Sequence, residues 1–250
     1  MTWDARKYEA WFSTPLGGFA LEQEKRLLDA MLAGWPRRCR RLLDVGCGTG
    51  VFLHLLWEMG FDVTGVDASP VMLKAARERF GNRAALHLGN GEHLPFEDDE
   101  FDFAVIWSVL EFAADPLAMI SEAVRVAEEG VLIGFLNRHS LYYRSHGPGR
   151  DRGQSPDSEV HTLAKARWYS WPEVRRMLKA ATGRKPALVR SVLHGPTWTW
   201  NRSLLRLVNT PILRPPLSAF GAFTAVRVDF TDRKPLTPLP ALRTKPEGVG

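Results

Sequence analysis

Residues 42–50 read Leu-Leu-Asp-Val-Gly-Cys-Gly-Thr-Gly, an apolar run that ends in an acid and three alternating glycines. The apolar side chains before the glycines indicate a buried parallel strand. The glycines allow a sharp turn and leave no Cβ between the backbone and a ligand. From Val51 the sequence is typical of a helix that ends at Gly60. A strand, a glycine turn and a helix form the nucleotide-binding corner of a doubly wound α/β sheet.

The spacing of these glycines does not fit a dinucleotide site. A dinucleotide fingerprint has the pattern G-x-G-x-x-G, and its third glycine would fall at Val51. Asp44 would also bring a negative charge close to a pyrophosphate. A carboxylate at this position suits a positively charged ligand, and Asp67, which follows the next predicted strand, suits the hydroxyls of a ribose. A ligand with an ammonium group and a ribose, but without phosphate, is S-adenosylmethionine.

Four blocks of the sequence resemble the class I S-adenosylmethionine-dependent methyltransferases, in particular the methyltransferase type 11 and ubiquinone- and menaquinone-biosynthesis-like branch. Residues 44–50 match the first motif of the family, and Asp67 matches the acid after its second strand. Residues 89–96, Gly-Asn-Gly-Glu-His-Leu-Pro-Phe, resemble the block that lies against the adenine in the family. Residues 101–112 resemble the strand and turn that border the methionine end of the cofactor. The blocks occur in family order.

The resemblance implies a site for S-adenosylmethionine, which leaves as S-adenosylhomocysteine. The residues that it assigns to cofactor binding follow the predicted strands: Asp44, Gly46, Cys47, Gly48, Gly50, Asp67, Ala68, Asn90, Gly91, Glu92, Trp107 and Ser108. Tyr8 joins them, because N-terminal helices in this branch commonly fold over the cofactor pocket and its hydroxyl could bind the methionine carboxylate. No metal ligands are predicted.

Two positions depart from the family pattern and bear on the chemistry. Asn90 stands where an aspartate usually accepts the adenine amino group, and its amide oxygen can still accept that hydrogen bond without the charge. Phe112 stands where many relatives have histidine, which removes one candidate general base. We therefore predict His139, which follows the fifth predicted strand, as the general base, because histidine titrates near neutral pH. Glu111 is interpreted as a structural or cofactor-side carboxylate.

Alternating strands and helices predict an α/β fold with a parallel sheet and helices on both faces. The resemblance implies a Rossmann-like doubly wound seven-stranded sheet that is mostly parallel, with a closing antiparallel strand. Strands are predicted at 41–46, 61–66, 84–89, 102–107, 130–136, 186–193 and 221–230, and helices at 4–12, 16–34, 50–59, 70–80, 116–127 and 172–181. The expected organisation is an N-terminal helical cap (1–35), a cofactor-binding core (36–137), a lid or insertion with the closing strands (138–230, irregular over 138–168) and a flexible Pro-rich tail (231–250).

The composition of the chain is that of an ordinary globular protein. Of its 250 residues, 45% are hydrophobic and 24% are charged. We expect no membrane span, since no run of about 18 apolar residues occurs, and no secretory signal. With only Cys39 and Cys47, neither a disulfide framework nor a metal cluster is predicted, and the expected location is cytoplasmic.

The charge is unevenly distributed along the chain. Residues 1–137 contain 13 Lys or Arg and 21 Asp or Glu, whereas residues 138–250 contain 20 and 7. We interpret the basic C-terminal half as an Arg-rich surface. A more specific alternative is that it binds an anionic acceptor. The Trp- and Leu-rich insertion at 195–216 suits an apolar acceptor or, less favoured, peripheral contact with an anionic membrane. Nucleic acid is disfavoured, because no basic block with interleaved aromatic residues occurs.

The function that these observations favour is transfer of a methyl group from S-adenosylmethionine to a small-molecule acceptor by in-line displacement. Two alternatives remain open at this level. One is an S-adenosylmethionine-binding protein without transferase activity, and the less favoured one is an NAD-dependent oxidoreductase. The residues identify neither the acceptor nor the oligomeric state.

Overall fold

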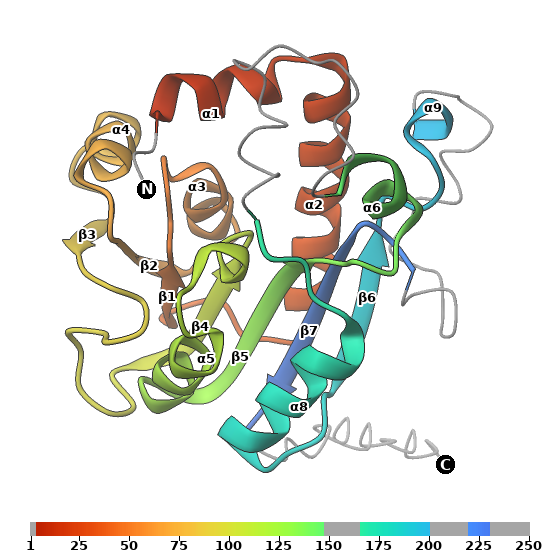
Figure 1. Ribbon diagram of the computed structural model, residues 1–250. Helices are drawn as coiled ribbons and strands as arrows, with labels where there is room; N and C mark the ends of the chain where they lie inside the picture. Colours follow the sequence, from red (N-terminus) through yellow and green to blue (C-terminus); the bar gives the residue numbers. More distant parts are fainter. Residues whose placement is uncertain (1–3, 148–165, 201–219, 231–250) are drawn as a thin grey trace, which may run out of the picture.

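The computed structural model describes residues 4–147, 166–200 and 220–230, which form one seven-stranded sheet covered by helices (Figure 1). The strands are β1 (Arg41–Val45), β2 (Asp62–Asp67), β3 (Ala85–Leu88), β4 (Phe101–Trp107), β5 (Ala127–Leu136), β6 (Leu188–Val192) and β7 (Phe223–Asp229), in the order β3-β2-β1-β4-β5-β7-β6. Pairing is parallel from β3 to β5, whereas β7 is antiparallel to β5 and β6. The predicted fold is confirmed.

Helices lie on both faces of the sheet, and each face has its own hydrophobic cluster. The helices are α1 (Ala5–Phe12), α2 (Pro15–Leu32), α3 (Val51–Glu58), α4 (Pro70–Phe80), η1 (Leu110–Phe112), α5 (Pro116–Arg125), α6 (Leu141–His146), α8 (Trp171–Thr182) and α9 (Thr197–Trp200). Leu42 belongs to the cluster with α2, α3 and α4, and the next residue, Leu43, belongs to the cluster with α5 and α8. Successive strand residues point to opposite faces, so both faces of the central strands are buried.

Short polar residues fix where several helices begin. The Thr14 hydroxyl accepts a hydrogen bond from the Gly17 backbone N–H at 3.0 Å, and Pro15 occupies the first turn of α2. Asp115 caps α5 in the same way, through the N–H groups of Leu117 and Ala118. Such caps satisfy backbone donors that have no partner within the helix.

The structure differs from the sequence-based boundaries at several points. β5 begins at Ala127, not at residue 130, because Ala127 pairs with Phe101 of β4. The short helices η1 and α9 were not expected. Residues 138–168 were expected to be irregular, but 141–146 form α6, whose buried Tyr142 stacks on Trp200 with ring centroids 5.1 Å apart. A helix of six residues is too short for hydrophobic periodicity to reveal it.

The strand order reverses between β1 and β4, and this reversal positions the site. In doubly wound sheets, ligands bind at the carboxyl ends of the strands where the order reverses. In Figure 1, α1 lies above this edge of the sheet. Within the described ranges, no helix combines the length and the apolar character that crossing a bilayer requires. The rest of the predicted lid and insertion (148–165 and 201–219) and the predicted tail lie outside the described residues.

Candidate functional site

A cavity of about 530 Å³ opens where β1, β2 and β4 end, and we refer to it as the strand-end cavity. This volume is in the range of small-molecule and cofactor sites. The predicted cofactor residues that line it are Tyr8, Asp44, Gly46, Cys47, Gly48, Asp67, Ala68, Asn90, Gly91, Glu92, Trp107 and Ser108. Gly50 is the exception, since it is the N-cap of α3, with a φ of 79°, and does not line the cavity. The fold therefore gathers these predicted residues around one space.

The glycine turn after β1 needs glycine for two different reasons. Gly46 has a φ of 73°, and a Cβ built on it would lie 2.4 Å from Cγ2 of Val109, so a side chain is excluded by conformation and by packing. Gly48 has a φ of 56°, and nothing lies within 4 Å of its Cβ position. The backbone at Gly48 is therefore open to a ligand in the cavity.

Two acids supply the negative charge of the strand-end cavity. Asp44 is only 2% exposed; its burial raises its pKa to about 7, and the charge of Asp67 contributes to this rise. Asp67 is held in place by the backbone N–H groups of Gly48 (2.9 Å) and Ser69 (2.8 Å), while its burial still raises its pKa. Neither acid makes an ion pair with a basic residue in the described ranges. A cationic ligand would supply the missing charge.

The loop after β3 forms another wall, and its polar side chains shape the loop itself. Oδ1 of Asn90 accepts a hydrogen bond from the Glu92 N–H at 3.0 Å. Oε1 of Glu92 accepts from the N–H groups of Ala114 (2.7 Å) and Asp115 (3.1 Å), which joins this loop to the start of α5. The Asn90 amide oxygen keeps a second lone pair, so it can still accept from an adenine amino group.

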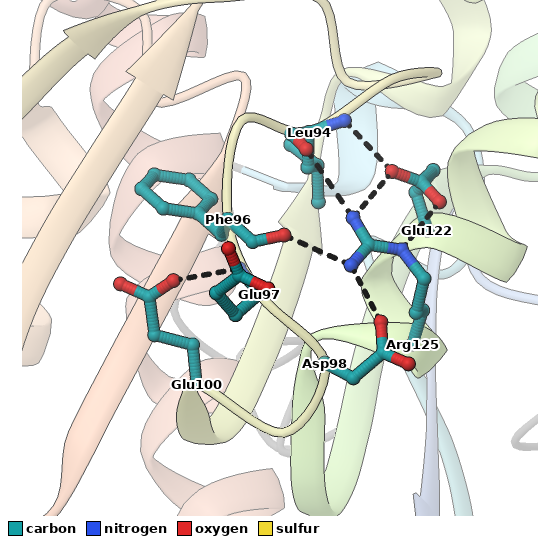
Figure 2. A network of polar contacts seen from close by, with 7 residues as sticks. All are labelled: Leu94, Phe96, Glu97, Asp98, Glu100, Glu122 and Arg125. Carbon is teal, nitrogen blue, oxygen red and sulfur yellow. Dashed lines mark hydrogen bonds and ion pairs between the residues drawn. The ribbon is translucent and has the colours of Figure 1, made fainter.

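Arg125 of α5 holds the chain that follows this loop (Figure 2). Its guanidinium donates to the carbonyl oxygens of Leu94 (3.2 Å) and Phe96 (2.9 Å) and pairs with Asp98 (2.8 Å). Glu122 completes the network: it pairs with Arg125 at 2.8 Å and accepts from the Leu94 N–H at 2.8 Å. The network anchors the wall of the strand-end cavity to α5, and the sequence patterns did not reveal it.

A second, smaller cavity of about 110 Å³ adjoins the first, and we call it the aromatic cavity. Its lining consists mainly of aromatic and aliphatic side chains from separate segments: Tyr8, Trp11, Phe12, Ala20, Glu24, Phe52, Ser108, Glu111, Phe112, Leu136, Tyr142, Leu193, Trp200 and Ala222. Four of these, Tyr8, Phe52, Ser108 and Phe112, also line the strand-end cavity. The two spaces therefore share a wall.

Two buried acids, Glu24 of α2 and Glu111 of η1, line the aromatic cavity. Burial raises the pKa of Glu24 to about 8; the hydrogen bond from the Ser108 hydroxyl (3.3 Å) opposes this rise and the charge of Glu111 adds to it. Burial likewise raises the pKa of Glu111 to about 7, although its Oε1 accepts a hydrogen bond from the Leu136 N–H. Among the described residues, Oε2 of Glu111 has no hydrogen-bond partner.

The backbone is strained at two points of the aromatic cavity. Ser108 and Leu193 have φ angles of 56° and 63°, in the left-handed region that residues with a Cβ rarely adopt. Each such residue costs about 1–2 kcal/mol. Non-glycine residues persist in this conformation where the surrounding structure holds them, and they cluster at functional sites.

Neither His139 nor Cys47 is suited to take part in proton transfer or nucleophilic attack at the site. His139 is exposed; its backbone N–H donates to Oδ1 of Asn137 at 3.0 Å, and it lines neither cavity. Burial raises the pKa of the Cys47 thiol well above its usual range, which leaves it protonated and a poor nucleophile. The described residues contain no group of three or more His, Cys, Asp or Glu that could hold a metal ion.

Sequence reasoning missed most of the aromatic cavity, apart from Trp200, which belongs to the insertion at 195–216 that was expected to suit an apolar acceptor. Glu24 offered a signal, because it interrupts the apolar face that Ala20, Leu27 and Leu28 form at helical spacing. An acid in such a stripe is buried on folding, and buried acids are rare unless they are paired or functional. The positions of Tyr142, Leu193 and Ala222 had no comparable signal.

Comparisons with known proteins agree with this geometry. The methyltransferase domain family matches residues 43–135. A demethylmenaquinone methyltransferase of Roseiflexus sp. is 31% identical over 179 residues, which cover 65% of this chain and 75% of that protein. An uncharacterized protein of Methanocaldococcus jannaschii is 37% identical over 181 residues, 70% of this chain and 76% of that protein.

The solved structures include a similar fold. An S-adenosylmethionine-dependent methyltransferase of Thermotoga maritima, described as a possible histamine N-methyltransferase, superposes with a TM-score of 0.69 and 25% identity, covering 90% of this chain and 95% of that one. The sequence relatives and this solved structure therefore agree with the family that the glycine turn, the acids and the sheet indicate. The chain belongs to the class I S-adenosylmethionine-dependent methyltransferases, and S-adenosylmethionine is its cofactor.

Proposed function

We propose that the strand-end cavity holds S-adenosylmethionine and that the aromatic cavity holds a small-molecule acceptor of its methyl group. The shared wall carries this proposal, because Tyr8, Phe52, Ser108 and Phe112 line both cavities. An acceptor bound in one cavity is therefore adjacent to a cofactor bound in the other.

The residues of the strand-end cavity fit this cofactor. The buried Asp44 carboxyl suits its ammonium group, and Asp67, oriented by two backbone N–H groups, suits the ribose hydroxyls. Asn90 can accept from the adenine amino group, and the open space at Gly48 lets the cofactor approach the backbone. When bound, the cofactor supplies a methyl group that its positively charged sulfur already activates.

The protein contributes positioning and the exclusion of water. The aromatic walls keep the reacting atoms away from bulk water, and a fixed acceptor about 3 Å from the methyl carbon gains most of the rate enhancement that orientation offers. The exposed position of His139 gives no support to its predicted role as general base. Glu24 and Glu111 are the groups in the aromatic cavity that could accept a proton.

The lining also bears on the acceptor. The two acidic side chains that line the aromatic cavity are the carboxyl groups of Glu24 and Glu111. An apolar or cationic acceptor therefore fits better than the anionic acceptor that the basic C-terminal half of the sequence suggested. The names of two relatives refer to demethylmenaquinone and histamine, which are small organic molecules. A cytoplasmic location, and a membrane contact through residues 195–216, remain predictions.

Filling the aromatic cavity tests the proposal. Ala20→Leu adds bulk to a 2% exposed position of the cavity lining, and Ala10→Leu adds the same bulk to an exposed position of α1. We expect Ala20→Leu to lower transfer of labelled methyl groups to a small-molecule extract by about tenfold or more. The affinity for S-adenosylhomocysteine, measured by calorimetry, should be unchanged in both variants.

Two results would contradict the proposal. One is unchanged methyl transfer by a folded Ala20→Leu protein, which would place the acceptor elsewhere. The other is tight binding of NADH with no detectable binding of S-adenosylhomocysteine, which would remove the cofactor from the strand-end cavity. Thermal unfolding of each variant shows whether the larger side chain has damaged the fold.

A further inference from the structure

The aromatic cavity contains two buried acidic side chains and no basic side chain among the described residues that line it. Glu24 is 8% exposed and Glu111 is 2% exposed, and neither makes an ion pair with a basic side chain of the described ranges. The ionisable groups that line the cavity are these two glutamates, Tyr8 and Tyr142. A buried acid without a counter-ion is costly, so such a pair needs either protons or a cationic ligand.

The walls around the two acids also suit a cation. The same small space is lined by seven aromatic residues: Tyr8, Trp11, Phe12, Phe52, Phe112, Tyr142 and Trp200. Aromatic faces attract ammonium groups through their quadrupole, most strongly where water is excluded. An apolar skeleton fills the rest of such a cavity by the hydrophobic effect. The two features together favour a molecule with an apolar body and one positively charged end.

We infer that the acceptor is a small amine with an apolar or aromatic body, whose ammonium group binds between Glu24 and Glu111 beneath the aromatic walls. This inference rests on the proposed function and names the class of acceptor. Ser108 belongs to both cavities and donates to Glu24, so this carboxyl group of the pair lies at the junction with the strand-end cavity. The amine nitrogen bound there lies next to the methyl donor.

The same acids account for the proton that the reaction must remove. An ammonium nitrogen has no free electron pair, so it first gives a proton to a carboxylate of the pair, which becomes a carboxylic acid. The nitrogen electron pair then forms a bond to the methyl carbon as the carbon–sulfur bond breaks and its electrons go to sulfur. The products are an N-methylammonium and S-adenosylhomocysteine, and the proton held by the glutamate returns to water after release.

The pKa values support this order of events. The values of about 8 for Glu24 and about 7 for Glu111 mean that the empty pair holds a proton at neutral pH. An ammonium group favours the ionised forms and therefore displaces that proton on binding. Amine binding should release protons and strengthen as the pH rises from about 6 to about 8, because the pair then ionises more readily.

The test compares amines with alcohols of the same carbon skeleton, in the series that begins with benzylamine and benzyl alcohol. Calorimetry is carried out with S-adenosylhomocysteine present. The amine of the series that binds most tightly should bind about 10- to 100-fold more tightly than the alcohol with the same carbon skeleton, as a charged hydrogen-bonded contact implies. Titration in buffers of different ionisation enthalpy should show proton release with the amine only. Labelled methyl transfer should follow the same preference.

Glu24→Gln and Glu111→Gln should each remove most of this preference and the proton release, whereas Glu22→Gln should keep both. Glu22 lies on the same helix, but its side chain is 53% exposed and pairs with Arg26. Equal affinity for amine and alcohol, or no amine binding by a protein that binds S-adenosylhomocysteine, would overturn the inference and leave the proposed function intact. Failure of the unaltered protein to bind S-adenosylhomocysteine would instead contradict the proposed function.

Discussion

The strand-end cavity and the aromatic cavity share a wall, yet they are built in opposite ways. The first is formed largely by turns at the ends of neighbouring parallel strands, and its key residues cluster in short sequence blocks. The second is formed by side chains from α1, α2, α3, η1, α6 and α9, from the end of β5, and from residues that follow β4 and β6 or precede β7. The comparison shows that the residues of the strand-end cavity are encoded locally, whereas those of the neighbouring aromatic cavity are brought together by long-range packing.

The largest expected effect tests whether the strand-end cavity depends on backbone conformation. Gly46→Ala forces a Cβ to within 2.4 Å of Val109 at a φ of 73°, so we expect a loss of about 2–5 kcal/mol in the free energy of unfolding. Gly48→Ala meets no neighbour within 4 Å and should lose only about 1 kcal/mol. Chemical denaturation of both variants measures the difference, and equal losses would show that packing against Val109 contributes nothing.

The next effect concerns the charge of the strand-end cavity. Asp44→Asn keeps the shape of the side chain but removes the carboxylate, and we expect about 10- to 100-fold weaker binding of S-adenosylhomocysteine. Asp62→Asn, on an exposed residue at the start of β2, is the control and should bind normally. Calorimetry checks both, and unchanged affinity in Asp44→Asn would show that Asp44 does not bind the cofactor.

Both cavities should make the ligand-free protein sensitive to pH. Asp44, Glu24 and Glu111 have raised pKa values near 7, 8 and 7, so the folded protein holds protons that the unfolded chain releases near pH 4. Their cost is absent below about pH 4 and grows as the pH rises towards 8. Each of the three groups contributes about 2–3 kcal/mol between pH 5.5 and pH 8, so we expect the ligand-free protein to be several kcal/mol less stable at pH 8 than at pH 5.5.

Glu24→Gln sharpens this measurement, because its amide cannot ionise. The variant should reduce the pH slope of the unfolding free energy, measured by denaturation at a series of pH values. The lowered pKa values of Glu122 and Glu173 act at lower pH and do not produce this slope. A slope that is the same in both proteins would mean that Glu24 is not the buried acid responsible.

The smallest effect concerns the support of the strand-end cavity. Arg125→Met removes the hydrogen bonds to Leu94 and Phe96 and the ion pair with Asp98 (Figure 2). We therefore expect the free energy of unfolding to fall by about 1–2 kcal/mol and the cofactor to bind more weakly. Arg26→Met breaks only an exposed pair with Glu22 and should change the stability by about 0.5 kcal/mol or less. Equal melting temperatures for the two variants would contradict a supporting role for Arg125.

Sequence reasoning predicted the strand-end cavity well, because its information is local. The positive φ angles at Gly46 and Gly48 follow from a turn that only glycine adopts readily, and the parallel strands bring Asp44 and Asp67 to the same edge of the sheet. Gly50 shows the limit of the motif. It belongs to the turn, but it lies at the start of α3 against the ring of Phe80 of α4, and it does not line the cavity. A shared motif does not mean a shared contact.

The aromatic cavity could not be predicted in the same way. Glu111 was interpreted as a structural or cofactor-side carboxylate, and His139 was selected because of its titration range and its place after a strand. Only the folded chain brings Glu111 together with Glu24 and leaves His139 exposed. Side-chain direction and burial decide such roles, and both depend on contacts between residues far apart in the sequence.

The sequence by itself determined the order of strands and helices, the glycine turn and the acids that suit S-adenosylmethionine. Hydrophobic periodicity and the conformational freedom of glycine act over a few residues, so they can be recognised without a structure. Only the tertiary structure decided that Glu24, Glu111 and several aromatic side chains meet beside the strand-end cavity. Their meeting depends on the packing of α1 against α2 and of α2 against α9, and on the stacking of Tyr142 of α6 on Trp200, which no local pattern specifies.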